Sequence, residues 1–238
     1  MSGEVVLEVF SGTESFSKIM RKAGSECFTI DNDPYFKPTL CKDILKVNLT
    51  ELPKNITIIW ASPPCQAFTV AQIGRNWNKD HTPKTEKALL GLKLLDKTIE
   101  IISLIKPAFW IIENPRGKMR KVIEPVFKKY AISNYVRNTV FYCQYGDKRM
   151  KPTDLWSDLF SWIPKPMCNY GDNCHEKAPR GSKTGTQGLK NSRERSIVPQ
   201  NLCIEIAEVI LGKKIPTFLE KVVVYEQSQQ TDFLEVKT

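Results

Sequence analysis

Short hydrophobic runs alternate with amphipathic stretches along the first two thirds of the chain. Apolar residues recur every three or four positions in 86–105, which predicts a long helix that Pro107 closes. Short β-rich runs with the length of strands span 5–10, 27–31, 56–61 and 109–112, and the apolar run at 56–61 suits a central buried strand. Strands that alternate with helices are typical of an α/β fold, in which a mostly parallel sheet carries helices on both faces.

The periodicity weakens after a predicted helix over 119–130 and a predicted strand over 136–143. Residues 146–195 are rich in Gly, Pro, Lys, Arg, Asn and Ser and show no regular pattern, and a helix returns over 199–211. We therefore expect an α/β domain, a short basic segment, a C-terminal helix that returns to the domain, and a polar tail. Their expected bounds are 1–150, 151–195, 196–225 and 226–238.

Positive charge is concentrated in one region of the chain, whose formal net charge is +9. Residues 116–195 hold 17 Lys and Arg against 7 Asp and Glu, a surplus of 10, so the rest sums to about −1. Such a surface is the expected footprint of a polyanion, because neutralised phosphates release counterions. A lysine-rich solvated surface is the alternative.

The cysteine pattern argues against a secreted protein. Seven cysteines are scattered over 238 residues, an odd number that does not suit a disulfide framework. We find no charged-then-apolar leader, and the longest apolar runs, such as 56–61, are far shorter than a membrane span. We expect a soluble, intracellular chain with reduced thiols, one of which could be a nucleophile.

The first strand leads into a small polar turn, Phe10-Ser11-Gly12-Thr13, that precedes a helix. Backbone amides and a helix N-terminus can meet a ligand there, and glycine permits close approach. Asp31 ends the next strand 19 residues after Gly12, where nucleoside-binding α/β folds place the acid that bonds ribose hydroxyls. Asp43 could contact an adenine amino group or cap a helix. A plain strand-to-helix turn is the alternative for the whole feature.

Cys65 follows a buried strand in the segment Ser62-Pro63-Pro64-Cys65-Gln66. The two prolines stiffen the loop, and the carboxyl edge of a parallel sheet is where such folds bind ligands, so this cysteine is predicted to be a site residue. Glu113-Asn114-Pro115 ends another strand 48 residues later, at the same predicted edge. A thiol and a carboxyl are therefore expected to converge. A helix cap or a surface ion pair is the alternative for the acid.

These residues carry a family resemblance. Phe10-Ser11-Gly12, Pro64-Cys65-Gln66 and Glu113-Asn114, in this order, resemble the cofactor loop, nucleophile loop and acid strand of the cytosine-C5 DNA methyltransferases. The resemblance covers residues 5–155 and, more weakly, 187–211, and the layout is similar to the short forms found in phages. It implies a Rossmann-like S-adenosylmethionine-dependent methyltransferase fold, with 1–150 as the catalytic and cofactor-binding domain and 151–195 as a small irregular substrate-recognition segment.

The same resemblance implies a setting for the protein. The partner would be double-stranded DNA, and the location would be the cytoplasm of a bacterial or phage-infected cell. Restriction protection in a restriction-modification system, regulation and phage DNA marking would all use the same chemistry. We assume a monomer.

The resemblance also implies a role for each residue. Cys65 would add as a thiolate to C6 of a cytosine flipped out of the duplex, so that C5 can accept the methyl group of S-adenosylmethionine. Glu113 would hydrogen-bond or protonate N3, Asn114 would hold the loop or the base, and Arg149 would position the base and the glutamate. The cofactor would contact Phe10, Ser11, Gly12, Thr13, Glu14, Ser15, Asp31, Asn32, Asp43, Ile44, Ser62 and Pro63. The DNA would contact Gln66, Arg116, Lys151, Arg180 and Lys183.

Three features depart from the family pattern. Glu14 stands where the family has a second glycine, so its side chain either points away or contacts the cofactor's ammonium group. Gln144 precedes the Tyr-Gly pair and Lys151 replaces an arginine, so Arg149 could instead form an ion pair or a phosphate contact. The stretch 150–196 is short for a recognition domain, which predicts a relaxed or very short target sequence.

Cys168 and the pair Cys174-His175 offer ligands that zinc prefers, with Cys143 as a fourth. Adjacent ligands are not a common zinc pattern, so we assign no metal and keep Cys168, Cys174 and His175 as zinc candidates. The segment 180–188 is interpreted as a DNA-contacting loop, with a plain flexible loop as its alternative, because it lacks the strand and the glycine-lysine order of a nucleotide-binding loop.

Two other functions stay open. One is an enzyme that uses the same thiolate on nucleotides or RNA, or that installs another one-carbon group. The other is a non-catalytic relative that binds DNA through residues 116–195, which the retention of Cys65 and Glu113 disfavours.

Overall fold

A single mixed sheet organises the chain. The computed structural model describes residues 3–169, 171–177 and 191–214, and seven strands lie in the order β3-β2-β1-β4-β5-β7-β6. The strands are β1 Val5–Val9, β2 Glu26–Asp31, β3 Leu40–Cys41, β4 Ile58–Ala61, β5 Phe109–Pro115, β6 Val136–Phe141 and β7 Pro152–Ser157. The five strands β3, β2, β1, β4 and β5 are parallel to one another. Strand β7 is antiparallel to both of its neighbours, β5 and β6. The predicted α/β class with a mostly parallel sheet is confirmed.

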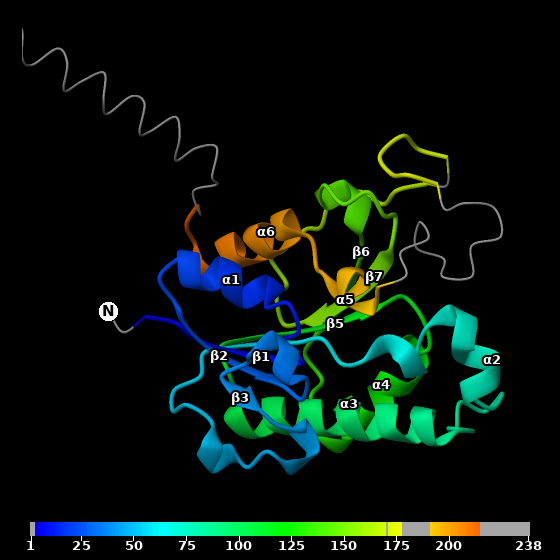
Figure 1. Cartoon of the computed structure of the whole chain (residues 1–238), viewed down its shortest axis with the longest axis horizontal. Coiled ribbons are helices and arrows are strands. Elements are labelled where there is room, and N and C mark those ends of the chain that lie inside the picture. The colour runs from blue at the N-terminus through cyan, green and yellow to red at the C-terminus, as the bar shows by residue number, and fades with distance from the viewer. Residues whose placement is uncertain (1–2, 170, 178–190, 215–238) are drawn as a thin grey trace, which may run out of the picture.

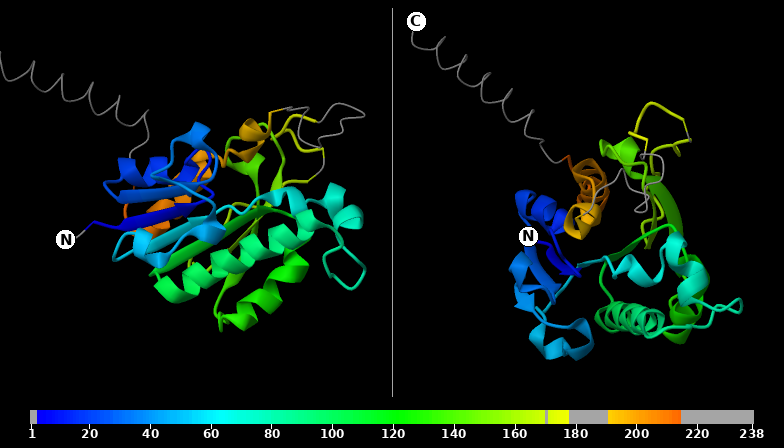
Figure 2. Two further views of the ribbon diagram at one scale, coloured as in Figure 1. Left: turned by 60° about the horizontal axis from the view of Figure 1, so that its bottom comes forward. Right: turned by 45° about the vertical axis from the view of Figure 1, so that its right-hand side comes forward.

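Helices cover both faces of this sheet, as Figure 1 shows. The α-helices are α1 Ser15–Lys22, α2 Ile73–Asn76, α3 Glu86–Ile105, α4 Met119–Lys129, α5 Ser192–Ser196 and α6 Gln200–Leu211. Helices α1 and α6 pack together on one face, and α3 and α4 pack on the other. The turned views in Figure 2 show the same three layers.

Each face of the sheet has its own hydrophobic core. On the α1 and α6 side, Phe16 stacks on Trp60 with ring centroids 4.6 Å apart, and Leu202 and Ile206 of α6 join them. On the α3 and α4 side, Leu95 and many other buried residues pack under the sheet. Because β4 is buried on both faces, its residues form the continuous apolar run that the sequence shows. Among the described residues, none of the helices has the length and apolarity needed to cross a bilayer.

Strand β7 changes the expected organisation. We predicted no element in 146–195, but Pro152–Ser157 lies in the sheet between β5 and β6. Five of its six residues are buried on both faces, so it lacks the alternation that marks a half-exposed strand. The buried Asp154 fits there because Arg120 binds it at 2.5 Å. The α/β sheet therefore continues to residue 157, past the expected boundary at 150. The tail expected at 226–238 and residues 215–225 lie outside the described residues.

The strand order fixes where a site can form. The chain leaves β1 toward β2 on one side and later builds β4 and β5 on the other, so the order reverses between β1 and β4. Open α/β sheets bind ligands at the carboxyl ends of the strands beside such a reversal. The predicted cofactor turn follows β1, and Cys65 follows β4.

Candidate active site

The loop that carries Cys65 is fastened to two strands. The amide of Ser62 donates a hydrogen bond to the carbonyl of Val9 at 3.1 Å, which extends the β1 and β4 pairing by one step. The Asn114 side-chain amide donates to the carbonyl of Pro63 at 2.7 Å, and Asn114 is only 1% exposed. The Asn114 side chain thus links the loop to β5. Cys65 then begins the short 3-10 helix η4, Cys65–Ala67.

A glycine after β5 allows a second contact with this loop. The amide of Lys118 donates to the carbonyl of Phe68 at 2.7 Å, and Gly117 forms an isolated β-bridge with Thr69. A Cβ atom at position 117 would lie 2.2 Å from the Phe68 carbonyl oxygen. Only glycine permits this approach, which sets η4 against the end of β5.

Glu113 lies at the carboxyl end of β5, in the strand beside β4, and is 5% exposed. Its carboxylate accepts a 2.9 Å hydrogen bond from the hydroxyl of Tyr142. Tyr142 begins the 3-10 helix η6, Tyr142–Tyr145, which follows β6. Burial and the nearby Glu113 raise the pKa of Tyr142 well above its usual value, so its hydroxyl stays a donor.

Lys151 brings a positive charge to the same place. Its ammonium lies 4.5 Å from the ring centroid of Tyr142 and donates to the carbonyl of Arg195 at 3.0 Å. Burial raises the pKa of Cys65, and the charges of Lys151 and Arg195 oppose that increase. Burial likewise lowers the pKa of Lys151, against the attraction of Glu113 and Cys65. Lys151 thus lies against the ring of Tyr142, whose hydroxyl bonds Glu113.

Arg149, predicted to be catalytic, is engaged elsewhere. Its guanidinium forms an ion pair with Asp147 and donates to the carbonyls of Glu194, Arg195 and Ile197 at 3.1–3.2 Å. Its donors are thus directed to its own turn and to the segment around α5. The alternative of an ion pair matches this geometry. The guanidinium also lies 5.7 Å from the ring centroid of Tyr142, against which the ammonium of Lys151 lies closer, at 4.5 Å.

The segment around α5 crosses from the cofactor side to the catalytic side. The guanidinium of Arg193 lies 3.7 Å from the ring centroid of Tyr35 and 3.5 Å from Asp33, both just after β2. The amide of Val198 donates to Ser15 Oγ at 3.2 Å. Together with the bonds from Arg149 and Lys151, these contacts tie residues 193–198 to both halves of the site.

The predicted cofactor turn has an unusual backbone. Phe10, Gly12 and Glu14 all adopt left-handed conformations, with φ of 57°, 44° and 53°, and such strain in non-glycine residues tends to occur at functional sites. The carboxylate of Asp31 accepts from the amide of Gly12 at 2.8 Å, so the acid at the end of β2 shapes the turn directly. The carboxylate of Glu14 bonds Thr29 Oγ1 at 2.9 Å and Arg21 at 2.6 Å. Its side chain is thus committed to α1 and β2, which fits the alternative in which it points away.

The turn has room and an unused polar atom for a cofactor. The hydroxyl of Ser11 is buried, and it has no hydrogen-bond partner within the described residues. A Cβ atom at Gly12 would meet nothing within 4 Å. Buried polar atoms are usually satisfied, so a ligand group beside Ser11 would supply the missing bond. The chemistry of this turn therefore fits a polar ligand such as S-adenosylmethionine.

The other predicted cofactor residues have mixed surroundings. Asp43 accepts from the amide of Leu45 at 3.0 Å and caps the 3-10 helix η2, Ile44–Lys46, which is the capping alternative. Ile44 is buried and Asn32 is exposed. Hydrogen bonds within the protein also engage Thr13, with Ser15 at 3.0 Å, and Ser62, whose hydroxyl accepts from Trp60 at 3.0 Å.

Of the predicted DNA contacts, Gln66 and Arg116 are exposed at the carboxyl ends of β4 and β5. Arg180 and Lys183, with the whole loop 180–188, lie outside the described residues. Cys168, Cys174 and His175 gather with Cys143 in a separate cluster.

Sequence reasoning missed two buried polar residues of this region. Tyr142 gave no signal, because a tyrosine after a strand is common and its partner Glu113 is 29 residues away. Glu8 did give one, since it is the only charged residue within β1. It accepts from the amide of Ser17 in α1 at 2.8 Å, and burial raises its pKa to about 7.

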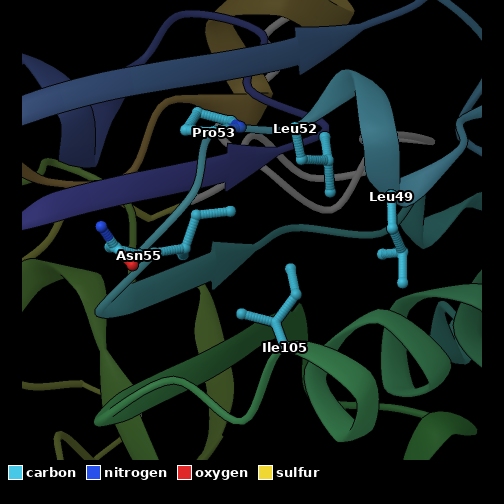
Figure 3. A pocket seen from close by; sticks show the side chains of 6 residues that line it. Leu49, Leu52, Pro53, Asn55 and Ile105 are labelled. Carbon is cyan, nitrogen blue, oxygen red and sulfur yellow. The ribbon is translucent and has the colours of Figure 1, made fainter.

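A pocket of about 310 Å³ lies at the opposite end of the strands. Figure 3 shows Leu49, Leu52, Pro53, Asn55 and Ile105 around it, and Ile56 completes the lining. Asn55 precedes β4 and Ile105 precedes β5, so this pocket opens at the amino ends of the strands. It is not part of the candidate active site.

Comparisons with known proteins identify the family of the chain. The model of the family "C-5 cytosine-specific DNA methylase" matches residues 5–133. The chain is 29% identical over 225 residues to the "Probable DNA (cytosine-5)-methyltransferase" of Frog virus 3 (isolate Goorha), an alignment that covers 86% of this chain and 99% of that protein.

Two solved structures are also similar to the chain. A Spodoptera frugiperda DNMT2 mutant is 18% identical with a TM-score of 0.45, over 71% of this chain and 57% of that one. The S. pombe Dnmt2 methyltransferase is 14% identical with a TM-score of 0.47, over 68% and 52%. The chain thus spans little more than half the length of these two structures.

Proposed function

The chain belongs to the C-5 cytosine-specific DNA methylase family and is a DNA (cytosine-5)-methyltransferase that uses S-adenosylmethionine, and from this premise we propose how its own residues act. Cys65 is the nucleophile, Glu113 the proton donor or hydrogen-bond partner of the base, and Lys151 the cation beside both. Asn114 and Tyr142 hold these groups in place. The observation that carries the proposal is geometric: Cys65 follows β4 and Glu113 ends the adjacent parallel strand β5. Asn114 fastens the Cys65 loop to β5, and Lys151 packs on the ring of Tyr142, which hydrogen-bonds Glu113.

Cys65 must act as a thiolate, because cytosine C5 is a poor nucleophile until a group adds at C6. The thiol gives its proton to solvent, and the positive charges of Lys151 and Arg195 stabilise the anion that remains. The thiolate then forms an Sγ–C6 bond, and the electron pair of the C5–C6 double bond moves to C5.

Glu113 compensates the charge that addition places on the ring. Its carboxyl hydrogen-bonds or protonates N3, while Tyr142 holds it by the 2.9 Å hydrogen bond. Asn114 keeps the nucleophile loop on the same edge through its bond to Pro63. After methylation, loss of the C5 proton to a base returns the electron pair to the ring, which expels Cys65 and returns the proton to Glu113.

S-adenosylmethionine, when bound, supplies the methyl group. We assign its binding to the turn of Phe10, Ser11 and Gly12, with the Ser11 hydroxyl as a polar contact, and to Asp31 beside it. Glu14 contributes through the backbone shape of the turn, since its carboxylate binds Thr29 and Arg21.

Double-stranded DNA is the proposed substrate form. The target atoms are stacked inside a duplex, so the cytosine must be flipped out at a cost of a few kcal/mol. The surplus of basic residues in 116–195 would offset that cost through phosphate contacts. Gln66 and Arg116 are exposed beside the nucleophile loop and β5, and Arg180 and Lys183 are proposed contacts from the same basic region.

The test combines methyl-labelled S-adenosylmethionine with duplex DNA, single-stranded DNA, RNA and cytidine nucleotides in separate reactions, followed by digestion and nucleoside identification. We expect labelled 5-methylcytosine from duplex DNA. Absence of 5-methylcytosine across duplexes of varied sequence would refute the activity. Label on RNA or mononucleotides alone would replace the duplex with another substrate.

The nucleophile is tested with a duplex that contains 5-fluorocytosine, which has no C5 proton to lose and so traps the covalent adduct. Peptide mapping should find the adduct on Cys65. Cys65→Ser should abolish transfer and trapping while S-adenosylmethionine still binds, and Cys41→Ser is the matched control, because Cys41 is an exposed free cysteine on the distant strand β3. Activity in Cys65→Ser, or an adduct on another cysteine, would overturn the assignment.

We also propose that the chain is a short, phage-type or viral member whose methylation protects DNA from restriction. The viral protein that matches it over 99% of its own length supports a short form. A plasmid methylated in cells that express the chain should resist a restriction enzyme blocked by 5-methylcytosine. A plasmid that stays fully cut by a panel of such enzymes would refute protection.

A further inference from the structure

Three cysteines and a histidine come together beside the catalytic edge. The ligand atoms of Cys143, Cys168, Cys174 and His175 all lie within 4.8 Å of one another. The Cys168 sulfur is 3.2 Å from that of Cys174 and 3.3 Å from His175 Nδ1, and the Cys174 sulfur is 3.6 Å from both Cys143 Sγ and His175 Nδ1.

The two 3.6 Å distances match the edges of a tetrahedron around a single ion, and the 3.2 and 3.3 Å distances are shorter than such edges. With zinc bonds of about 2.3 Å to sulfur and 2.0–2.1 Å to nitrogen, tetrahedral ligands lie about 3.5–3.8 Å apart. An iron–sulfur cluster would need its thiolates farther apart, because several metal and sulfide atoms would separate them. Three soft thiolates and one imidazole in a tetrahedral arrangement select zinc over the oxygen-preferring ions.

The cluster joins η6 to a segment that makes few hydrophobic contacts. Cys143 belongs to η6, whereas the other three ligands lie between 168 and 175, where the described residues form no helix or strand. The hydrophobic contacts there are few: Cys143 and Cys168 pack with Phe141, and Met150 lies against them. A segment that buries so little apolar surface needs another source of stability.

The remaining contacts in this region support the same geometry. The Gln144 side chain donates to the Cys174 sulfur at 3.6 Å, as hydrogen bonds to metal-bound thiolates do. The amide of Glu176 donates to the carbonyl of Lys148 at 2.9 Å. Cys143 and Cys168 are buried, His175 is partly buried and Cys174 is exposed, so the site is closed toward the protein and reachable by an ion from solvent.

We propose that Cys143, Cys168, Cys174 and His175 bind one structural zinc ion. The ion fixes the first part of the recognition segment to η6, the helix whose residue Tyr142 hydrogen-bonds Glu113. All four positions carry protein ligands, which is typical of a structural site and leaves no open position for catalysis. The proposal concerns the shape of the DNA-facing segment and does not depend on the roles given to Cys65 and Glu113.

Native mass spectrometry and elemental analysis of the full chain, purified without chelator, test the proposal directly. We expect about one zinc per chain and release of that zinc when a thiol reagent modifies the cysteines. Cobalt substitution should give the visible absorption of tetrahedral cobalt bound by thiolates. A zinc-free protein that cannot be loaded with zinc or cobalt would refute the site, and so would a Cys168–Cys174 disulfide found by peptide mapping under non-reducing conditions.

Variants test whether these four residues are the ligands. Cys174→Ser changes an exposed position and should leave the fold intact, yet lower zinc affinity by at least about 100-fold. Cys41→Ser, another exposed cysteine, should keep one zinc. Removal of zinc should speed proteolysis within 158–177 and weaken DNA binding, while S-adenosylmethionine binding, measured by calorimetry, stays within about twofold because the turn of Ser11 lies elsewhere. Full zinc content in both Cys174→Ser and His175→Ala would overturn the assignment.

Discussion

The hydrogen bond from Tyr142 to Glu113 makes a measurable prediction about catalysis. Both side chains are buried and the bond is 2.9 Å long, so water cannot replace it when it is removed. Tyr142→Phe deletes only the hydroxyl and keeps the ring that lies under Lys151. A hydrogen bond to a charged group contributes about 1.5–3 kcal/mol, and each 1.36 kcal/mol is a factor of ten in rate. We therefore expect the rate of methyl transfer to fall by about 10- to 150-fold.

Single-turnover transfer of labelled methyl to a saturating duplex measures this rate without the product-release step. The dissociation constant of S-adenosylmethionine should stay within about twofold, because the proposed cofactor turn does not touch Tyr142. Tyr145→Phe is the matched control: it removes a hydroxyl from the same 3-10 helix, where the partners are Glu205 and Lys165. A Tyr142→Phe rate within twofold of the unaltered enzyme, or an equal loss in Tyr145→Phe, would refute the role given to this bond.

Three further predictions concern stability. Burial raises the pKa of Glu8 from 4.5 to about 7, so the folded chain binds the proton more tightly; stability should fall by up to about 3 kcal/mol between pH 4.5 and 7 and level off above that. Thermal melts over pH 4.5–8 measure how the melting temperature depends on pH. This dependence should be weaker in Glu8→Gln than in the unaltered protein. An equal dependence in the two proteins would exclude Glu8 as its cause. Arg120→Met leaves the fully buried Asp154 without its 2.5 Å ion pair, which should cost about 3–5 kcal/mol in urea unfolding; a loss below about 1 kcal/mol would contradict this. Gly117→Ala places a Cβ atom 2.2 Å from the Phe68 carbonyl oxygen, so the melting temperature and methyl transfer should both decrease, whereas Gly74→Ala, where a Cβ meets nothing within 4 Å, should leave transfer unchanged.

The central strands and the longest helix could be predicted from the sequence because their signals are local. The run at 56–61 became β4, Ile58–Ala61, and the periodic stretch 86–105 became α3 with the same bounds. Once β4 and β5 are adjacent and parallel, residues just after them must share an edge. That geometry is enough to bring Cys65 and Glu113 together, and the family comparison confirms the kind of enzyme.

Strand β7 could not be predicted in the same way, because its stability depends on a distant residue. Asp154 in its middle would be costly to bury alone, and the compensating Arg120 lies 34 residues earlier. Arg149 shows the same limitation. Its partners are carbonyls of residues 194–197, about 45 residues later, and no local pattern indicates that these would take its donors.

The short helix η6 connects the proposed catalytic groups to the proposed zinc site. Its first two residues contact different partners. Tyr142 hydrogen-bonds Glu113 at the carboxyl end of β5, and Cys143 belongs to the cluster of three thiols and one imidazole. Lys151, at the start of the return into β7, packs on the Tyr142 ring and holds Arg195. A shift of η6 would therefore move the partner of Glu113 and the anchor of residues 168–175 together.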